Sequence, residues 1–336
     1  MSNCIGLDIS KKLIAVHIPI NKLDIEIENN TKGIKKLYSK LKKLYKKEYE
    51  NLIFIYEPTG SYSSTLTKFC NNQNIKCFII NPKQFSNHSK ALGQRAKSDK
   101  IDAQVLSKAM YLARDGEIKV PQYDKVVEEI KELMGYYKFT TKAKTKASNH
   151  LESLKAKDGS SYAISDLKRT INNYKKQQSD IISKIKDIIQ SNEKLQQGYE
   201  NIRSIKGIGE IGGIALLHLF IKYPKANQRE ITSLAGLDPI DKSSGTSVQT
   251  KSKISKAGSK LYRGSLFMGV ITAIQYDDNF KAFFTRLKAN GKHTTLAQLA
   301  VMRKMIIIAH SLYKNNKKYD KEVYKKAVGI NKYYEF

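Results

Sequence analysis

Four acidic residues in the first third of the chain have the types and spacing of a metal-binding carboxylate set. Asp8 lies within the apolar run of residues 4–9, where a buried charge is costly unless it is paired or bound to a metal. Glu57 directly follows a second apolar run and precedes a Pro-Thr-Gly turn. Asp99 and Asp102 are three residues apart, a spacing that puts both carboxylates on one face of a helix.

Together these carboxylates predict a site for two magnesium ions, with Mn²⁺ as the alternative metal. Hard cations prefer oxygen ligands, and two of them about 4 Å apart activate a nucleophile and stabilise the leaving oxygen of a phosphodiester. Asp99 alone also suits the start of a helix, and Glu57 alone suits a turn. Asp8 is the hardest to explain structurally, so the set as a whole favours phosphodiester chemistry.

A glycine-rich segment in the last third of the chain, Ser204-Ile-Lys-Gly-Ile-Gly, resembles a helix-hairpin-helix turn. In such a turn Gly207 and Gly209 let backbone N–H groups approach a phosphate. Glycine turns between helices are common, so this segment is weak support for phosphate binding.

Ser244 lies beside Gly245 in a polar segment, and Lys256 and Arg263 follow it. A serine hydroxyl on a glycine-flexed turn can attack a phosphodiester, with the two cations stabilising the charge that develops. From spacing alone, a polar loop without chemistry is the better explanation.

The elements that carry the acidic residues alternate in an ordered series. Apolar runs predict strands at residues 4–9, 13–18, 23–27, 52–56 and 75–80. Helical spacing predicts helices at residues 33–47, 62–72 and 97–114. The resulting order βββαβαβα matches a ribonuclease-H-like α/β fold, in which two acidic strand ends meet an acidic helix face.

Four segments are expected along the chain. Residues 1–120 form the α/β domain that carries the acidic set. Residues 121–203 are polar and intermittently periodic, which predicts a helical, coiled-coil connector interrupted near residues 158–161. Residues 204–315 predict a second, mainly α-helical domain, and residues 316–336 form a basic tail.

The charge predicts a polyanionic partner, because 60 Lys and Arg residues against 31 Asp and Glu residues give a formal net charge of +29. The base composition of the genome accounts for the use of Lys in place of Arg, but it does not account for the excess of basic over acidic residues. Nucleic acid is favoured over a membrane, since no stretch approaches the roughly 18 to 20 apolar residues that span a bilayer. The three cysteines lack disulfide or zinc spacing and no signal-peptide pattern is present, so a cytoplasmic location is predicted.

These motifs resemble one family, the DEDD transposases of insertion sequences in the group numbered one hundred and ten, which includes pilin-gene invertases. Its pattern of a strand aspartate, a glutamate before Thr-Gly, and Lys-Ser/Thr-Asp-x-x-Asp-Ala is met by Asp8, Glu57, Asp99 and Asp102. Its C-terminal pattern of Gly-Leu-x-Pro, Ser-Gly and Ile-Ser-Lys-x-Gly is met by Gly236, Leu237, Pro239, Ser244, Gly245, Ile254, Ser255, Lys256 and Gly258. Tyr262 stands before Arg263, where the family usually has leucine.

The resemblance implies a RuvC-like first domain, a coiled-coil linker and a transposase domain, working as homodimers that pair into a homotetramer at the nucleoid. It implies that Ser244 is the nucleophile of a phosphoserine–DNA intermediate, and that a structured bridge RNA pairs with donor and target DNA. Backbone contacts to these nucleic acids would then come from Lys97, Lys100, Gly207, Gly209, Lys256 and Arg263. Two alternatives stay open: a nuclease that hydrolyses branched DNA with the carboxylates and water, and a non-catalytic nucleic-acid binder.

Overall fold

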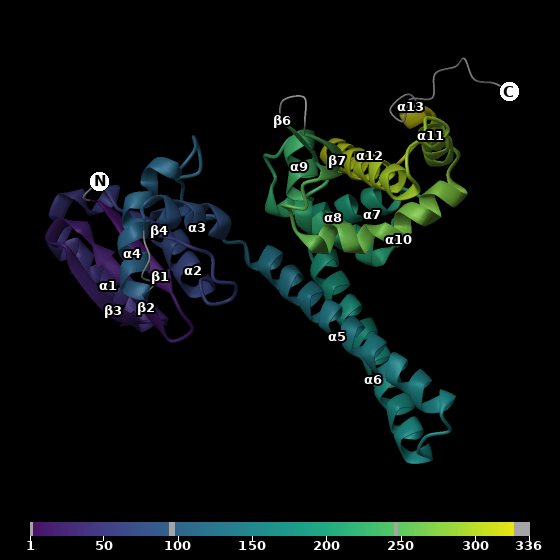
Figure 1. Ribbon diagram of the computed structural model, residues 1–336, viewed down its shortest axis with the longest axis horizontal. Coiled ribbons are helices and arrows are strands. Elements are labelled where there is room, and N and C mark those ends of the chain that lie inside the picture. Colours follow the sequence, from purple (N-terminus) through teal and green to yellow (C-terminus); the bar gives the residue numbers. More distant parts are fainter. Residues whose placement is uncertain (1–2, 94–97, 245–247, 326–336) are drawn as a thin grey trace. The chain divides into compact units, whose positions relative to one another are not determined.

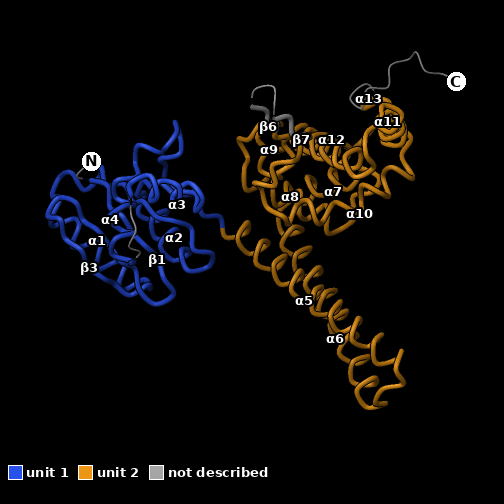
Figure 2. The backbone as a smooth tube through the Cα atoms, viewed as in Figure 1, with its two compact units in different colours: residues 1–124 blue, residues 125–336 orange. Residues whose placement is uncertain are grey.

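The computed structural model describes residues 3–93, 98–244 and 248–325, with the backbone alone over residues 241–244 and 248–252. The chain divides into two compact units, Met1–Asp124 and Lys125–Phe336 (Figure 2). The boundary lies close to Pro121, where the sequence predicts the first break. The finer division into four segments stays a prediction.

The first unit is built on a five-stranded mixed sheet of order β3-β2-β1-β4-β5 (Figure 1). Strands β1 (Cys4–Ile9), β2 (Leu13–Ile18) and β3 (Leu23–Glu28) are antiparallel neighbours, and β4 (Ile53–Tyr56) and β5 (Lys76–Ile79) run parallel to β1. The α-helices are α1 (Thr31–Tyr45), α2 (Ser64–Asn72), α3 (Pro82–Ala91) and α4 (Asp99–Lys108). This series confirms the predicted order of elements and adds one helix, α3, that the sequence analysis missed.

Helices cover both faces of this sheet, because β1, β4 and β5 carry buried apolar side chains on both sides. Leu7 and Val16 belong to the core beneath α1 and α2, together with Leu37 of α1. Ile55 belongs to the core on the other face, together with Val105 of α4. The elements that carry the acidic residues are thus fixed by two separate cores.

The second unit begins with two long helices, α5 (Lys125–Ala156) and α6 (Ser161–Gln190), which pack along each other (Figure 1). Gln178 of α6 bridges to α5, accepting from Lys144 Nζ at 2.7 Å and donating to Thr141 Oγ1 at 2.7 Å. The turn between the helices falls where the sequence predicts an interruption. Coiled-coil packing of this pair stays a prediction.

A helical bundle follows, and its core unites the ends of α5 and α6 with the later helices. These are α7 (Glu193–Arg203), α8 (Glu210–Lys222), α9 (Gln228–Leu234), α10 (Lys260–Tyr276), α11 (Asp278–Ala289), α12 (Thr294–Asn315) and the short α13 (Lys321–Lys325). A hairpin of β6 (Pro239–Ser244) and β7 (Val248–Ile254) interrupts the helices and was not predicted.

Helix α12 is the one described helix that is long and apolar enough to cross a membrane. Half of its apolar stretch is buried inside the unit, where Val301, Met305 and Ala309 belong to the core. Burial against the other helices accounts for its composition, as expected for the central helix of a bundle.

Candidate active site

Asp8 and Glu57 occupy neighbouring positions at the carboxyl ends of two parallel strands. The register of β1 and β4 pairs Leu7 with Tyr56, so the next residues along the two strands are Asp8 and Glu57. Pro58 then follows, and because proline has no N–H group, strand pairing ends there. Both acidic side chains are half-buried. The fold thus brings two of the four predicted ligands next to each other.

The side chain of Asp8 lies on the sheet face that α4 covers. Side chains alternate between faces along a strand, so Asp8 shares its face with Gly6. A Cβ atom added to Gly6 would lie 1.9 Å from the carbonyl oxygen of Ala103 and 2.5 Å from the backbone nitrogen of Ser107, both in α4. Glycine at this position lets the helix lie directly on the strand, two residues from Asp8.

Helix α4 carries the other two acidic residues in its first turn. Ser98 caps the helix, its side-chain oxygen accepting a hydrogen bond from the backbone nitrogen of Ile101 at 3.3 Å. Asp102 is buried, with 7% of its surface exposed, whereas Asp99 is exposed. The spacing predicts one shared helix face, but only Asp102 is buried, beside the residue that contacts Gly6.

A polar network that the sequence analysis missed ties α4 to the edge of the sheet. Asp24 of β3 accepts a hydrogen bond from Gln104 Nε2 at 2.9 Å, forms an ion pair with Lys100 Nζ at 3.3 Å, and lies 2.7 Å from Nδ1 of His17 in β2. Burial alone would raise the pKa of Asp24, but the hydrogen bonds from His17, Gln104 and Lys100 outweigh it and lower the pKa. The network therefore holds the helix that carries Asp102, and it engages Lys100, which was predicted to contact nucleic acid.

The described residues contain no group of three histidine, cysteine, aspartate or glutamate side chains close enough together to hold a metal ion. Asp8, Glu57 and Asp102 each already make a polar or electrostatic interaction. Their chemistry suits a hard divalent cation, because all three are carboxylates and Asp102 is buried. The fold thus places Asp8 and Glu57 next to each other but does not bring all four carboxylates together. Their role as metal ligands stays a prediction. Lys97 lies outside the described residues.

Ser244 ends strand β6, where its backbone pairs with Val248 at the start of β7. Gly245 lies outside the described residues. At the base of this hairpin, Ser255 Oγ donates a hydrogen bond to Asp238 Oδ1, and the Ser255 backbone nitrogen donates to the Asp238 carbonyl oxygen at 2.8 Å. Two motifs, joined through residues 17 positions apart, thus form the base of the hairpin that carries Ser244. The role of Ser244 as nucleophile stays a prediction.

Arg263 and Lys256, the two cations of the serine motif, have different surroundings. Arg263 of α10 is half-buried, and its Nη1 donates to the carbonyl oxygens of Ala235 at 2.7 Å and Gly258 at 3.1 Å. Lys256 is exposed, and its backbone nitrogen donates to the Gly236 carbonyl oxygen at 3.1 Å. Arg263 therefore holds the backbone of the motif together, while Lys256 leaves its ammonium group at the surface; the predicted nucleic-acid contacts of both remain predictions.

The turn that contains Gly207 and Gly209 joins α7 to α8. Gly207 has a φ of +95°, and a Cβ atom there would lie 2.3 Å from the carbonyl oxygen of Gly269 in α10, so packing demands glycine. Gly209 caps α8, and a Cβ atom there would meet nothing within 4 Å. Glu210, which follows, forms an ion pair with Lys186 of α6. Packing thus explains Gly207, and phosphate binding at this turn stays a prediction.

Two transposase family models match the chain over the elements described above. The DEDD transposase model of the IS110 type matches residues 5–155, and the model described as the transposase IS116/IS110/IS902 family matches residues 199–285. The pilin gene-inverting protein of Moraxella bovis is 26% identical over 328 residues, which cover 95% of this chain and 98% of the relative. The protein of the same name from Moraxella lacunata is 27% identical over 279 residues, which cover 81% of this chain and 83% of the relative. Since the first model spans all four acidic residues and the second spans Ser244, this chain belongs to the IS110 family of transposases.

Proposed function

We propose that this transposase cleaves and rejoins DNA strands through a covalent serine intermediate, with Mg²⁺ or Mn²⁺ bound by its carboxylates and a bridge RNA as guide. Family membership makes DNA the substrate, gives the first unit a ribonuclease-H-like fold, and implies a general dependence on divalent metal. One observation carries the proposal: Asp8 and Glu57 are adjacent at two strand ends, beneath the helix in which Asp102 is buried.

In the proposed reaction the hydroxyl oxygen of Ser244 attacks the phosphorus of a phosphodiester. The bond between phosphorus and serine oxygen forms, the bond to the leaving strand breaks, and the serine proton is transferred so that the leaving oxygen departs as a hydroxyl. Asp8, Glu57, Asp99 and Asp102 would hold the metal, which when bound supplies positive charge next to the phosphate oxygens. Attack by another strand's hydroxyl on the phosphoserine bond then rejoins DNA without an external energy source.

We propose that the protein works as a homodimer that pairs into a homotetramer, with Ser244 completing a site whose carboxylates belong to another subunit. Support comes from α5, which exposes a stacked pair of aromatic rings, Tyr136 and Phe139, with centroids 6.3 Å apart. Large exposed aromatic side chains on a long helix are typical of a contact surface. The α5–α6 pair would then meet its copy as a coiled coil.

The guide is proposed on the strength of the charge. A net charge of +29 suits backbone contacts to donor DNA, target DNA and RNA together, and a protein that delegates sequence reading to base pairing needs few base-reading side chains. The complex would act in the cytoplasm, on the DNA of the nucleoid.

The test uses the full chain with its co-purified RNA, donor and target DNA, and either Mg²⁺ or a chelator. After denaturation, a gel resolves covalent protein–DNA adducts. We expect adducts with the wild type and with the neighbouring control Ser243→Ala, and none with Ser244→Ala or Asp8→Asn. Asp115→Asn, an exposed carboxylate outside the predicted set, is the second control.

Two results would replace the proposal with one of the alternatives. Strand cleavage that survives Ser244→Ala and leaves no adduct would identify a hydrolytic nuclease. Retained DNA binding with no strand cleavage by the wild type, with RNA and metal present, would indicate a non-catalytic binder.

A further inference from the structure

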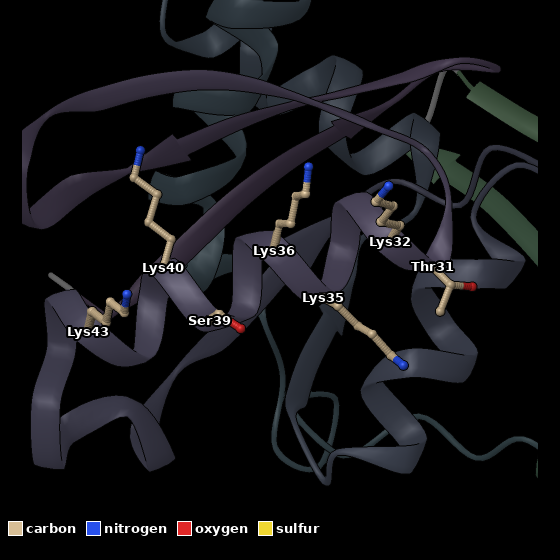
Figure 3. A pocket seen from close by; sticks show the side chains of 7 residues that line it. All are labelled: Thr31, Lys32, Lys35, Lys36, Ser39, Lys40 and Lys43. Atoms are coloured by element: carbon tan, nitrogen blue, oxygen red, sulfur yellow. The ribbon is translucent and has the colours of Figure 1, made fainter.

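Helix α1 presents a row of lysines on its outer surface. Its apolar residues Ile34, Leu37 and Leu41 are buried against the sheet. The opposite side of the helix borders a surface hollow of about 710 Å³. Thr31, Ser39 and five lysines line this hollow (Figure 3). We call the five lysines the lysine face: Lys32, Lys35, Lys36, Lys40 and Lys43.

The lysine face is separate from the candidate active site. Helix α1 packs on the side of the sheet that carries Leu7, whereas Asp8 lies on the side covered by α4. A DNA strand at the carboxylates would therefore leave the lysine face free for a different stretch of nucleic acid.

The arrangement of these lysines is unfavourable for the isolated helix. Lys32, Lys36 and Lys40 are spaced four residues apart, so like charges are neighbours along one side, and Lys32 lies in the first turn, where the helix dipole disfavours a cation. Residues 31–45 include no aspartate or glutamate. In the parts of the chain that the structure describes, no ion pair involves the lysine face. An ordinary solvated helix surface would intersperse acidic partners.

Lys42 of the same helix, in contrast, contacts two aromatic rings. Its ammonium nitrogen lies 4.6 Å from the ring centroid of Tyr38 and 5.1 Å from that of Tyr49. Within the described parts of the chain, the five lysines of the lysine face make no such contact with a ring, and all five are exposed. Figure 3 shows Lys32, Lys36 and Lys40 extending to one side of the helix and Lys35 to the other.

We propose that the lysine face binds the phosphate backbone of duplex DNA outside the reacting strand. From Lys32 to Lys43 the helix rises roughly 16 Å, which spans about five phosphates of one strand at 3.4 Å along the DNA axis. Lysine ammonium groups on flexible stems contact phosphates without reading sequence. The proposal rests on DNA as the family's substrate and is independent of Ser244 and of the metal.

The test measures binding of the full chain to a duplex DNA of about three helical turns in a chelator, so that no cleavage occurs. Lys32, Lys36, Lys40 and Lys43 are changed together to glutamine. The matched control changes four exposed lysines of the same unit outside α1, Lys22, Lys76, Lys83 and Lys119, and so removes the same charge. The affinity is followed against salt concentration, because each phosphate contact contributes about 0.9 to the slope of log affinity against log salt.

We expect the lysine-face variant to reduce that slope by about 3 to 4 and the control to reduce it by about 1 or less. The lysine-face variant should also melt at or above the wild-type temperature, because repulsion along α1 is relieved, so a loss of binding cannot be assigned to unfolding. Equal losses in the two variants, or no loss in either, would overturn the proposal. A slope change seen with duplex RNA and absent with duplex DNA would also refute duplex DNA as the occupant. Ser244→Ala should keep the wild-type slope, which separates this test from that of the serine chemistry.

Discussion

Replacing Gly6 by alanine tests whether the contact between β1 and α4 positions the carboxylates. The added methyl carbon would lie 1.9 Å from the carbonyl oxygen of Ala103, and since Cβ atoms stay beyond 3.0 Å from backbone atoms, α4 must move by about 1 Å. Overpacking of this kind lowers the free energy of unfolding by about 1–3 kcal/mol. For a unit of this size, that loss lowers the melting temperature by roughly 5–15 °C. Because Asp102 moves with the helix, adduct formation should fall by about a hundredfold even where the protein is folded.

The assay combines thermal unfolding of the full chain with the rate of adduct formation at a temperature where each variant is folded. Gly135→Ala in α5 is the control, because a Cβ atom there meets nothing within 4 Å and alanine is the better helix former. That variant should gain about 0.5–1 kcal/mol in the unfolding measurement. If Gly6→Ala melts and reacts like the wild type, the close contact of strand and helix does not position the site, and the reasoning is wrong.

Three further predictions concern stability. Asp24→Asn should lower the free energy of unfolding at neutral pH by about 1 kcal/mol. Because the pKa of Asp24 is lowered in the folded protein, the carboxylate stabilises the fold above about pH 4 and loses this effect below it. Urea unfolding of the variant and the wild type should therefore give the same stability at low pH. Burial lowers the pKa of His218 and of His310 to about 4. The free energy of unfolding should therefore fall as the pH decreases from about 6.5 to about 4, by up to about 3 kcal/mol for His218. In His218→Gln this fall should be shallower. Gly207→Ala should lose about 2–4 kcal/mol in denaturant unfolding, whereas Gly209→Ala should stay near wild type; equal behaviour of the two would contradict the packing argument.

The strands of the first unit could be predicted because each is a short run, either apolar or alternating between apolar and polar residues, that is bounded by polar residues. The predicted bounds of β1 and β2 are those observed, Cys4–Ile9 and Leu13–Ile18. Helix α3 escaped prediction because it is polar and buries only Phe85 and His88, so no apolar periodicity marks it. The hairpin of β6 and β7 escaped for a similar reason, since its strands are rich in Lys, Ser and Thr.

The candidate site shows where sequence reasoning stops. The adjacency of Asp8 and Glu57 follows from two acidic residues that end parallel strands, which the sequence pattern indicates. The different burial of Asp99 and Asp102 does not follow, because a spacing of three residues gives the helix face but not how much of the helix the sheet covers. The contact of Gln104 with Asp24 depends on strand register and helix placement, which local patterns do not encode.

A carboxylate site that acts on DNA must bind phosphates although its own side chains are negatively charged, and the two faces of the sheet differ in charge. The register places Glu26 of β3 and Asp8 of β1 in one row on the α4 side, with Ala15 between them. Two strand spacings amount to roughly 10 Å, too far for both to bind one metal ion and slightly more than the Debye length of about 8 Å at physiological salt, so the charge of Glu26 is only partly screened at Asp8. Phosphates that approach this edge therefore meet more negative charge than the predicted ligands alone provide. The attraction that holds the DNA must come from cations elsewhere, and the α1 side of the same sheet presents five lysines without an acidic residue in their helix. Under the proposed function, separating the binding charge from the carboxylates holds the substrate by its backbone without placing lysines beside the acidic residues.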